Sequence, residues 1–256
     1  MSNDEQSQST FTLDGRRIPF TPGQTIMDAA LAAGVYIPHL CHKPGYAPHG
    51  SCRVCVVRAD GRELSACTAP AAADMSVESE VPDIRALRVA VLQMLFAEGN
   101  HVCPACEASG NCTLQAVAYH CGMLTPRFPQ RFPRRAVDAS HPDVILDHNR
   151  CILCELCVRA SRDHDGKAVF AVSGRGIGSR LIVDAPSGRL GDTDFSAEDA
   201  AAHVCPVGAI LPRDEAFRTP IGRRRFDVAP VSRVGDVAPD PDAEAPVPDT
   251  ATEVMV

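Results

Sequence analysis

Residues 151–157 bring three cysteines onto one short arc of the chain. Cys151, Cys154 and Cys157 follow the spacing C-x2-C-x2-C within the stretch RCILCELCVRA, residues 150–160. Zinc is usually held by two separate C-x2-C pairs, so this spacing is not typical of a zinc site. Three thiolates on one arc can instead hold three corners of a [4Fe–4S] cube, which leaves the fourth corner to a ligand elsewhere.

The next cysteine along the chain is a natural fourth ligand. Cys205 follows Cys157 after 47 intervening residues and is followed directly by Pro206. Proline after the remote cysteine is typical of bacterial ferredoxin runs, in which that cysteine ligates the other of two clusters. This sequence has one C-x2-C-x2-C run, so we expect Cys205 to complete the same [4Fe–4S] cluster.

A second group of cysteines lies nearer the N-terminus with the spacing C-x10-C-x2-C-x11-C. The small residues Gly45 and Gly50 in the first gap allow a loop to wrap closely around a bound group. Four thiolates in a small mixed domain are typical of a [2Fe–2S] centre, and a zinc site with the same ligands is the alternative. The four predicted ligands are Cys41, Cys52, Cys55 and Cys67.

A third group has the spacing C-x2-C-x5-C and needs a non-cysteine ligand to complete it. If residues 113–121 are helical, Cys121 lies about 900° of rotation and roughly 13 Å beyond Cys112, and His120 is nearly as distant. His101 lies in the loop itself, two residues before the first cysteine. We therefore predict a [4Fe–4S] cluster with one imidazole and three thiolate ligands: His101, Cys103, Cys106 and Cys112.

Eleven cysteines and one histidine then form three complete sets of four. Of the 12 cysteines, Cys121 alone is left over, and we expect it to be a packed, unreactive thiol. A zinc-stabilised scaffold protein is the alternative from another functional class, and it would contain no acid-labile sulfide.

Secondary-structure signals predict how these sets are positioned. Turns at Asp14-Gly15 and Asp60-Gly61 predict two hairpins, and Thr25 with Asp28 predicts a capped helix ending near Gly34. A strand over MSVESEV completes a small α+β domain. Further along, we predict helices over 82–98 and 113–120, an extended connector near 125–135 and a hairpin around SGRGIGSR. The apolar stripe expected for the first of these helices is Ile84, Leu87, Val91, Leu92 and Leu95.

The predicted organisation is α+β throughout, in five segments. Residues 1–9 are expected to be disordered, 10–80 to form the [2Fe–2S] domain, 81–140 a helix with the histidine/cysteine-ligated [4Fe–4S] segment, and 141–227 a ferredoxin-like [4Fe–4S] domain. Residues 228–256 are acidic and proline-rich and are expected to be a disordered tail.

Composition narrows the functional class. The formal net charge is −7, of which the six acids and one base after residue 229 contribute −5, so no nucleic-acid surface is indicated. No signal peptide and no run of 18 apolar residues is present, and cluster ligation is favoured over disulfides in a reducing compartment, so we expect a cytoplasmic protein. No nucleotide-binding glycine fingerprint and no residue for hydride or proton transfer is recognisable, so no catalytic residue is assigned.

In order and spacing, the motifs resemble those of a known family. The stretches that carry the resemblance lie within residues 11–227 and are GVYIPHLC, GSCRVC, FAEGNHVCPACEASGNCTLQAVAY, RFPQRFPRR, RCILCELCVR, CPVGAI and PIGRRRF. They resemble the N-terminal region of the large iron–sulfur subunit of respiratory complex I, of [FeFe] hydrogenases and of some NAD-dependent formate dehydrogenases. They are most similar to the small diaphorase (HoxU-type) subunits of NAD-reducing [NiFe] hydrogenases.

The resemblance implies a β-grasp ferredoxin domain, a segment with one histidine and three cysteine ligands, and a ferredoxin-like [4Fe–4S] domain. Two departures from the complex I pattern stand out. That pattern places its histidine four residues before the first cysteine, where this chain has Gly99, and its chains continue into a large C-terminal domain. Both departures are expected of the diaphorase group.

The implied function is electron relay in an oxidoreductase complex, with H2 and NAD+ converted to NADH and H+. The resemblance implies a flavin- and NAD-binding diaphorase subunit and the small and large [NiFe] hydrogenase subunits as partners, with FMN, NAD and the Ni–Fe centre on those chains. A formate dehydrogenase or a complex I-like enzyme using the same relay is the alternative.

Overall fold

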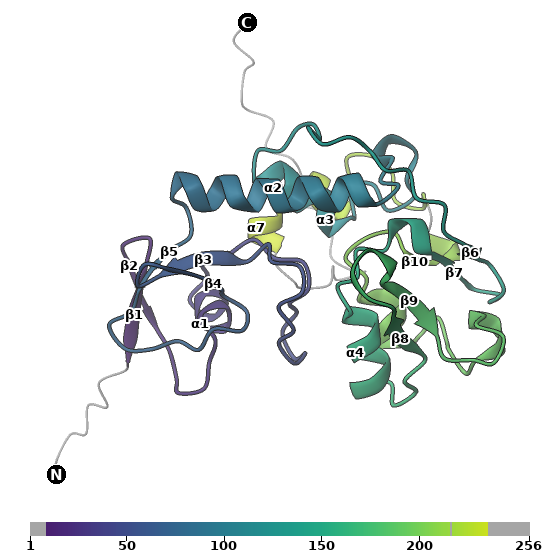
Figure 1. Ribbon diagram of the computed structural model, residues 1–256, viewed down its shortest axis with the longest axis horizontal. Helices are drawn as coiled ribbons and strands as arrows, with labels where there is room; N and C mark the ends of the chain where they lie inside the picture. The colour runs from purple at the N-terminus through teal and green to yellow at the C-terminus, as the bar shows by residue number, and fades with distance from the viewer. Residues whose placement is uncertain (1–8, 216, 235–256) are drawn as a thin grey trace, which may run out of the picture.

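The structure is a computed structural model that describes residues 9–215 and 217–234. Residues 1–8 of the N-terminal segment predicted to be disordered, and residues 235–256 of the predicted tail, lie outside the described residues. Within the described part, two lobes lie at opposite ends of a long helix, α2 (Pro82–Glu98) (Figure 1). Helices and strands occur in both lobes, which confirms the predicted α+β class.

The N-terminal lobe is a five-stranded mixed sheet in the order β2-β1-β5-β3-β4. Only β1 and β5 pair in parallel, and the other neighbours are antiparallel. Both predicted hairpins form, because Asp14, Gly15, Asp60 and Gly61 adopt the positive φ angles that a two-residue turn requires. The strands are β1 (Thr10–Leu13), β2 (Arg16–Pro19), β3 (Val56–Ala59), β4 (Arg62–Ser65) and β5 (Ser76–Glu78).

Helix α1 (Ile26–Ala32) packs in the same lobe and begins at the predicted capping box. The Asp28 backbone N–H donates to Thr25 Oγ1 at 3.1 Å, and the Thr25 N–H donates back to Asp28 Oδ2 at 3.3 Å. The core beneath the helix contains the alternating strand residues Phe11 and Leu13, which are both fully buried. The arrangement of one helix on a mixed sheet agrees with the expected β-grasp domain.

Helix α2 forms over the predicted residues, but its buried face differs from the predicted stripe. The buried positions recur every four residues at Ile84, Arg88, Leu92 and Phe96, whereas Leu87 is 38% exposed. Arg88 takes a core position because its guanidinium supplies donors to the adjacent sheet. A hydrophobic pattern does not reveal a charged residue whose partners are backbone carbonyls.

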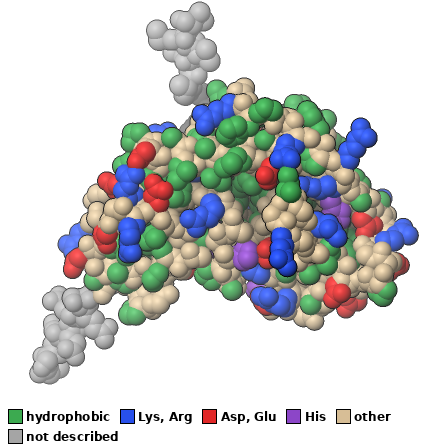
Figure 2. Space-filling view, viewed as in Figure 1, with side chains coloured by type: hydrophobic (Ala, Val, Ile, Leu, Met, Phe, Trp, Pro, Cys, Tyr) green, Lys and Arg blue, Asp and Glu red, His purple; other side chains and the backbone are tan. Residues whose placement is uncertain are grey.

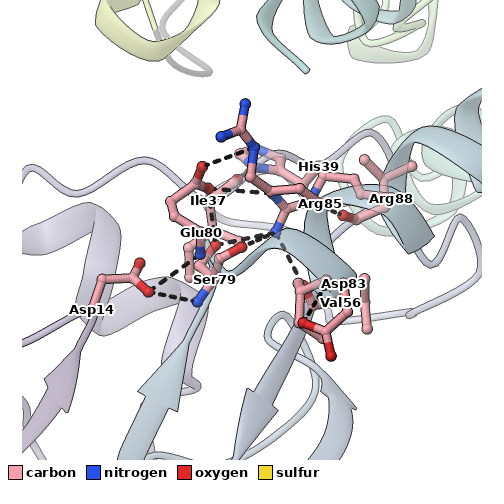
Figure 3. A network of polar contacts seen from close by, with 11 residues as sticks. Asp14, Ile37, His39, Val56, Ser79, Glu80, Asp83, Arg85 and Arg88 are labelled. Atoms are coloured by element: carbon pink, nitrogen blue, oxygen red, sulfur yellow. Dashed lines mark hydrogen bonds and ion pairs between the residues drawn. The ribbon is translucent and has the colours of Figure 1, made fainter. Parts of the chain in front are cut away.

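Arg88 ties α2 to the N-terminal lobe through several hydrogen bonds (Figure 3). Nε donates to the Val54 carbonyl at 3.0 Å, Nη2 donates to the Val56 carbonyl at 3.0 Å and to Ser79 Oγ at 3.1 Å, and Nη1 pairs with Glu80 at 3.3 Å. At the tip of the first hairpin, Asp14 Oδ1 accepts hydrogen bonds from the backbone N–H groups of the same Ser79–Glu80 segment. The helix is therefore held rigidly on β3.

The C-terminal lobe contains two small antiparallel sheets, in the orders β10-β7-β6 and β8-β9 (Figure 1). The β8-β9 pair is the hairpin predicted around SGRGIGSR. The strands are β6 (Val137–Asp138), β7 (Val144–Asp147), β8 (Phe170–Ser173), β9 (Arg180–Val183) and β10 (Ile210–Pro212), with helices α4 (Leu156–Asp163) and α5 (Ala200–His203). Single-turn 3-10 helices lie at Cys103–Ala105, His148–Arg150, Gly176–Gly178, Leu190–Asp192 and Arg213–Glu215.

The segment between the lobes contains α3 (Thr113–His120), which forms where the sequence predicts it, followed by an extended connector. Helices α6 (Arg225–Val228) and α7 (Val231–Val234) return to this region. Disorder was expected from residue 228, but residues 231–234 are helical and Val231 is 3% exposed. One apolar residue in a polar segment can anchor a short helix to a core that composition does not reveal.

One hydrophobic cluster joins the two lobes. It contains Cys41 and Cys52 from the N-terminal lobe, Leu92 from α2, and Cys154 and Cys157 from the C-terminal lobe. On the surface face shown in Figure 2, basic and acidic side chains are interspersed, with hydrophobic side chains between them. Within the described residues, no helix has the length and hydrophobicity needed to cross a membrane.

Candidate iron–sulfur centres

The first cysteine set gathers beside the sheet of the N-terminal lobe. Cys41, Cys52, Cys55 and Cys67 are all buried. The Cys52 N–H points at Cys41 Sγ at 3.5 Å, and Cys55 Sγ lies 3.3 Å from Cys67 Sγ. The turn that brings Cys52 and Cys55 together passes through Arg53, whose φ of 59° is left-handed. Cys41 also contacts the Cys52 and Cys67 thiols, so the four thiols form one continuous group, which fits four thiolate ligands of a [2Fe–2S] centre.

The four buried thiols of this set differ in pKa. Hydrogen bonds from the Cys52 and Cys67 thiols hold the pKa of Cys41 below its ordinary value, and a hydrogen bond from Cys67 lowers the pKa of Cys55 to about 7. The donors Cys52 and Cys67 have raised pKa values for the same reason. Because the thiolate is the metal-binding form, the lowered pKa values of Cys41 and Cys55 favour the form of these two residues that binds iron.

The second set lines a pocket between α2, α3 and the start of the C-terminal lobe. Its lining includes all four predicted ligands, His101, Cys103, Cys106 and Cys112, together with Phe96 and Arg150. His101 Nε2 is buried and has no hydrogen-bond partner among the described residues. A buried polar nitrogen without a partner costs free energy unless a ligand or metal occupies its lone pair or proton.

Burial also lowers the pKa of His101 to about 4, with a further contribution from the charge of Arg150. The imidazole is therefore neutral near pH 7, and neutral imidazole is the form that coordinates metals. A Cβ atom at Gly99 would lie 2.4 Å from His101 Nε2, so a glycine at this position leaves room for the ring. Position 99 is where the complex I pattern has its histidine, so the shorter His101 arrangement excludes a side chain there.

Cys121, which we excluded as a ligand from the sequence, lies at the far end of α3 from Cys112, as expected. It follows the last residue of α3, and it does not line the pocket. Burial raises the pKa of its thiol to about 11, which keeps it protonated. These observations agree with a packed thiol.

The third set surrounds a second pocket within the C-terminal lobe. Cys151, Cys154, Cys157 and Cys205 all line it, so the fold brings the remote cysteine to the three-cysteine arc. Two left-handed residues, Leu153 and Glu155, curl the arc so that its thiols converge. The rest of the lining is mainly aliphatic: Ile152, Leu153, Val172, Leu181, Val207, Ala209 and Ile210.

Burial in these apolar surroundings raises thiol pKa values in both [4Fe–4S] sets. The pKa of Cys151 rises to about 11 and that of Cys112 to about 12, and those of Cys154 and Cys157 rise well above their ordinary value. Without a bound group these thiols stay protonated. A positively charged metal centre would compensate the desolvation of the thiolates, so the lining fits an iron–sulfur cluster.

Contacts between the sets place the third set in the middle. Arg159 of α4 donates through Nη2 to the Cys41 carbonyl at 2.6 Å and to the Cys154 carbonyl at 3.3 Å. On the other side, Cys112 Sγ lies 3.7 Å from the Pro206 carbonyl, next to Cys205. The first and second sets therefore each contact a segment that carries third-set cysteines.

Sequence reasoning missed three arginines at these sites: Arg88, Arg150 and Arg159. Arg150 and Arg159 flank the three-cysteine arc directly, and a basic residue beside a thiolate cluster was the available signal. Arg88 carried no such signal, because the sheet carbonyls to which it donates, those of Val54 and Val56, lie more than 30 positions away in the sequence.

Family models match the chain in three consecutive regions. A 2Fe-2S iron-sulfur cluster binding domain matches residues 6–82, an NADH-ubiquinone oxidoreductase-G iron-sulfur binding region matches 88–127, and a 4Fe-4S single cluster domain matches 144–211. The chain therefore has one [2Fe–2S] domain and two [4Fe–4S] binding regions, as predicted.

A curated relative covers almost the same length. The chain is 41% identical over 221 residues to the NAD-reducing hydrogenase HoxS subunit gamma of Cupriavidus necator, an alignment that covers 86% of this chain and 94% of the relative. This chain belongs to the family of NAD-reducing hydrogenase gamma subunits. The predicted family is thereby confirmed.

A solved structure agrees with this family. A chain in the crystal structure of an NAD+-reducing [NiFe]-hydrogenase in the H2-reduced state matches with a TM-score of 0.86 and 54% identity, covering 89% of this gamma-type chain and 97% of the other. At that identity the likeness extends beyond the fold to the sequence motifs.

More distant relatives are much longer than this gamma-type chain. It is 34% identical over 218 residues to the 78 kDa subunit of NADH-ubiquinone oxidoreductase of Candida albicans, and 31% identical over 211 residues to the NADPH-Fe(3+) oxidoreductase subunit alpha of Geobacter sulfurreducens. It spans 29% and 24% of those two relatives. The kinship implies an electron-relay role shared across these oxidoreductases.

Proposed function

We propose that this chain relays electrons within an NAD-reducing [NiFe] hydrogenase, the enzyme that converts H2 and NAD+ to NADH and H+. The observation that carries the proposal is the gathering of all twelve expected ligands into three separate sets within a chain of this family: the first is buried, and the other two each line a pocket. When bound, iron–sulfur clusters accept and release single electrons, which suits a path between two centres that each handle electron pairs.

We assign the ligands set by set. The [2Fe–2S] ligands are Cys41, Cys52, Cys55 and Cys67, and the ligands of the two [4Fe–4S] clusters are His101, Cys103, Cys106 and Cys112, and Cys151, Cys154, Cys157 and Cys205. The contact between the Cys55 and Cys67 thiols, the unpartnered Nε2 of His101 and the convergence of Cys205 on the arc support these assignments.

We further propose the domain division 10–80, 81–140 and 141–227, with the third-set site between the other two along the electron path. Arg159 and the Pro206 carbonyl support this order, because each joins the third-set loops to a neighbouring set. The protein's own contribution is to hold the thiolates and the imidazole, to exclude water from the sites and to supply hydrogen bonds to them.

The partner chains of the proposed complex are a flavin- and NAD-binding diaphorase subunit and the small and large [NiFe] hydrogenase subunits. FMN, NAD and the Ni–Fe centre would reside on those chains. We also propose a cytoplasmic location, in keeping with the many free thiols of the chain.

The proposal is tested by the metal content of the native complex that co-purifies with this chain under anaerobic conditions. Nickel together with iron and acid-labile sulfide is the expected result. Molybdenum or tungsten without nickel would assign the relay to a formate dehydrogenase-type enzyme instead. Colourless protein with zinc and no labile sulfide would overturn the relay itself.

A further inference from the structure

Arg150 lies between the second and third ligand sets. It ends the 3-10 helix His148–Arg150 and is bonded directly to Cys151 of the third set, yet its side chain lines the pocket of the second set. The side chain is 18% exposed. The backbone of Arg150 therefore adjoins the third set, whereas its guanidinium lies at the second set.

The guanidinium is held in a fixed position. Nε pairs with Asp147 Oδ2 at 3.0 Å, and Nη1 pairs with a Glu107 carboxylate oxygen and donates to the Gly208 carbonyl at 3.4 Å. From this position Nη1 also donates to Cys106 Sγ at 3.6 Å, a normal range for the larger sulfur atom. The Asp147 carboxylate accepts a hydrogen bond from the Asn149 backbone N–H, so the holding group is itself oriented.

The space for this contact is kept by a glycine. A Cβ atom at Gly208 would lie 3.0 Å from Ala108 Cβ and 3.3 Å from Arg150 Nη1, both closer than most real contacts, and 3.4 Å from Cys106 Sγ. A side chain there would crowd the guanidinium that donates the hydrogen bond. The sequence CPVGAI thus contributes a ligand, Cys205, and also the room for a contact at the neighbouring set.

We propose that Arg150 is a positioning residue that raises the reduction potential of the cluster held by His101, Cys103, Cys106 and Cys112. This inference rests on the proposed relay function. Arginine stays protonated at all relevant pH values, and its N–H groups stabilise negative charge on sulfur. Reduction adds one electron, and therefore one negative charge, to the second-set site, so a fixed cation on Cys106 favours the reduced state.

The electron balance of the transfer is simple. One electron leaves the third-set site, which is oxidised by one unit, and enters the second-set site, which is reduced by one unit. No bond forms or breaks and no proton moves, because Arg150 remains protonated throughout. Glu107 carries the opposite charge beside Cys106 and so opposes the effect of Arg150.

The test is an anaerobic redox titration of the full cluster-loaded chain, following each cluster by electron paramagnetic resonance. The variants are Arg150→Met, Arg150→Lys and Glu107→Gln. Arg162→Met is the matched control, because Arg162 is an exposed arginine of α4 that pairs with its neighbour Asp163. The second-set signal is identified as the one that His101→Ala removes.

We expect Arg150→Met to favour the oxidised second-set cluster about tenfold, a potential lower by about 59 mV for one electron. Arg150→Lys should restore part of the shift, and Glu107→Gln should move the potential upward, since it removes a negative charge. The [2Fe–2S] potential should not move in any variant, and Arg162→Met should match the unmodified chain.

An unchanged second-set potential in Arg150→Met overturns the inference. So do shifts of the same sign in Arg150→Met and Glu107→Gln, because loosened structure rather than charge would then explain both. If Arg150→Met fails to retain the cluster, the other two variants test the inference. An upward shift of the second-set potential in Glu107→Gln supports it, and a shift of the same sign in Arg150→Lys and Glu107→Gln overturns it. Absence of all three signals from the unmodified chain would instead overturn the proposed relay.

Discussion

At the scale of single residues, the second set depends on one imidazole. His101 is half-buried against Phe96, with ring centroids 5.4 Å apart, and its buried Nε2 has no partner among the described residues. A side chain in this state is stabilised only when something binds the nitrogen. That physical argument distinguishes His101 from Cys121, which lies outside the pocket.

Replacing His101 with alanine should remove or alter the second-set signal and leave the other two clusters intact. Total iron should fall from roughly ten to roughly six atoms per chain if the cluster is lost. His101→Cys should keep a four-ligand cluster with a lower potential, because a thiolate brings more negative charge than an imidazole. Iron analysis and electron paramagnetic resonance check both outcomes.

Cys121→Ser is the matched control for His101. It should retain all three signals and the full iron content. If the second-set signal is lost in Cys121→Ser and unchanged in His101→Ala, then Cys121 is the fourth ligand and His101 is not.

The protonation of the cysteines leads to a pH dependence of cluster assembly. Each ligand must lose its proton before it binds iron, so assembly releases protons and is favoured as pH rises. The raised pKa values of Cys112, about 12, and Cys151, about 11, make this competition strong in the [4Fe–4S] sets. In the first set the pKa values of Cys41 and Cys55 are lowered, whereas those of Cys52 and Cys67 are raised, so only two of its four thiols compete strongly with protons.

Reconstitution of metal-free protein at about pH 6.5 and at about pH 8.5 checks this expectation. The yield of the two [4Fe–4S] signals should fall more at the lower pH than the yield of the [2Fe–2S] signal. An equal loss in all three sets, or better assembly at low pH, would contradict it.

At the scale of elements, α2 is fixed to the N-terminal lobe by Arg88 rather than by apolar packing alone. Its side chain, 1% exposed, donates to the Val54 carbonyl and to the Val56 carbonyl, and Figure 3 shows the contact to Val56. Val54 is one of the two residues between Cys52 and Cys55. The helix that leads to the second set therefore also braces the loop of the first.

Arg88→Met should lower the free energy of unfolding by about 3 kcal/mol, because it leaves buried carbonyls without these donors. Arg85→Met on the exposed side of the same helix should cost no more than about 0.5 kcal/mol, since Arg85 makes only an exposed contact to Glu80 at 3.8 Å. Denaturant unfolding followed by visible absorbance measures both. An equal loss of unfolding free energy in Arg88→Met and Arg85→Met would show that the hydrogen bonds of Arg88 do not stabilise the protein.

At the scale of the whole molecule, Arg159 joins the lobes. It is 5% exposed and donates to carbonyls of the first-set loop, Cys41 and Ala47, and of the third-set arc, Cys154. The shared hydrophobic cluster lies around this contact. The relative position of the first and third sets is thus determined by one cation and the core around it.

Arg159→Met should lower the free energy of unfolding by about 3 kcal/mol, because the buried carbonyls of Cys41 and Cys154 lose a charged donor. In air, the first-set and third-set signals should decay faster than in the unmodified chain, since water and oxygen would reach the loosened contact between lobes. The second-set signal should decay at its normal rate. Faster decay confined to the second set would contradict this role, and Arg162→Met again serves as the control.

Much of the molecule was predictable from local chemistry. The three ligand sets, the two hairpins, the capped helix and α2 follow from spacings and turn residues within short windows. The predicted stripe of α2 failed at Leu87 because burial depends on what lies across the interface, and the onset of disorder at residue 228 failed because Val231 has a core to bind.

The sequence by itself determined how many clusters the chain can hold and which residue types would bind them, because ligation depends on thiolates and an imidazole at short spacings. Only the tertiary structure supports the proposed order of the three sites and places Arg150 and Arg159 between them. The bond from Arg159 to the Cys41 carbonyl joins residues 118 positions apart, and no local pattern records such a pairing. The partner of a buried charged side chain can be identified only in the folded chain, because the fold brings distant residues into contact with it.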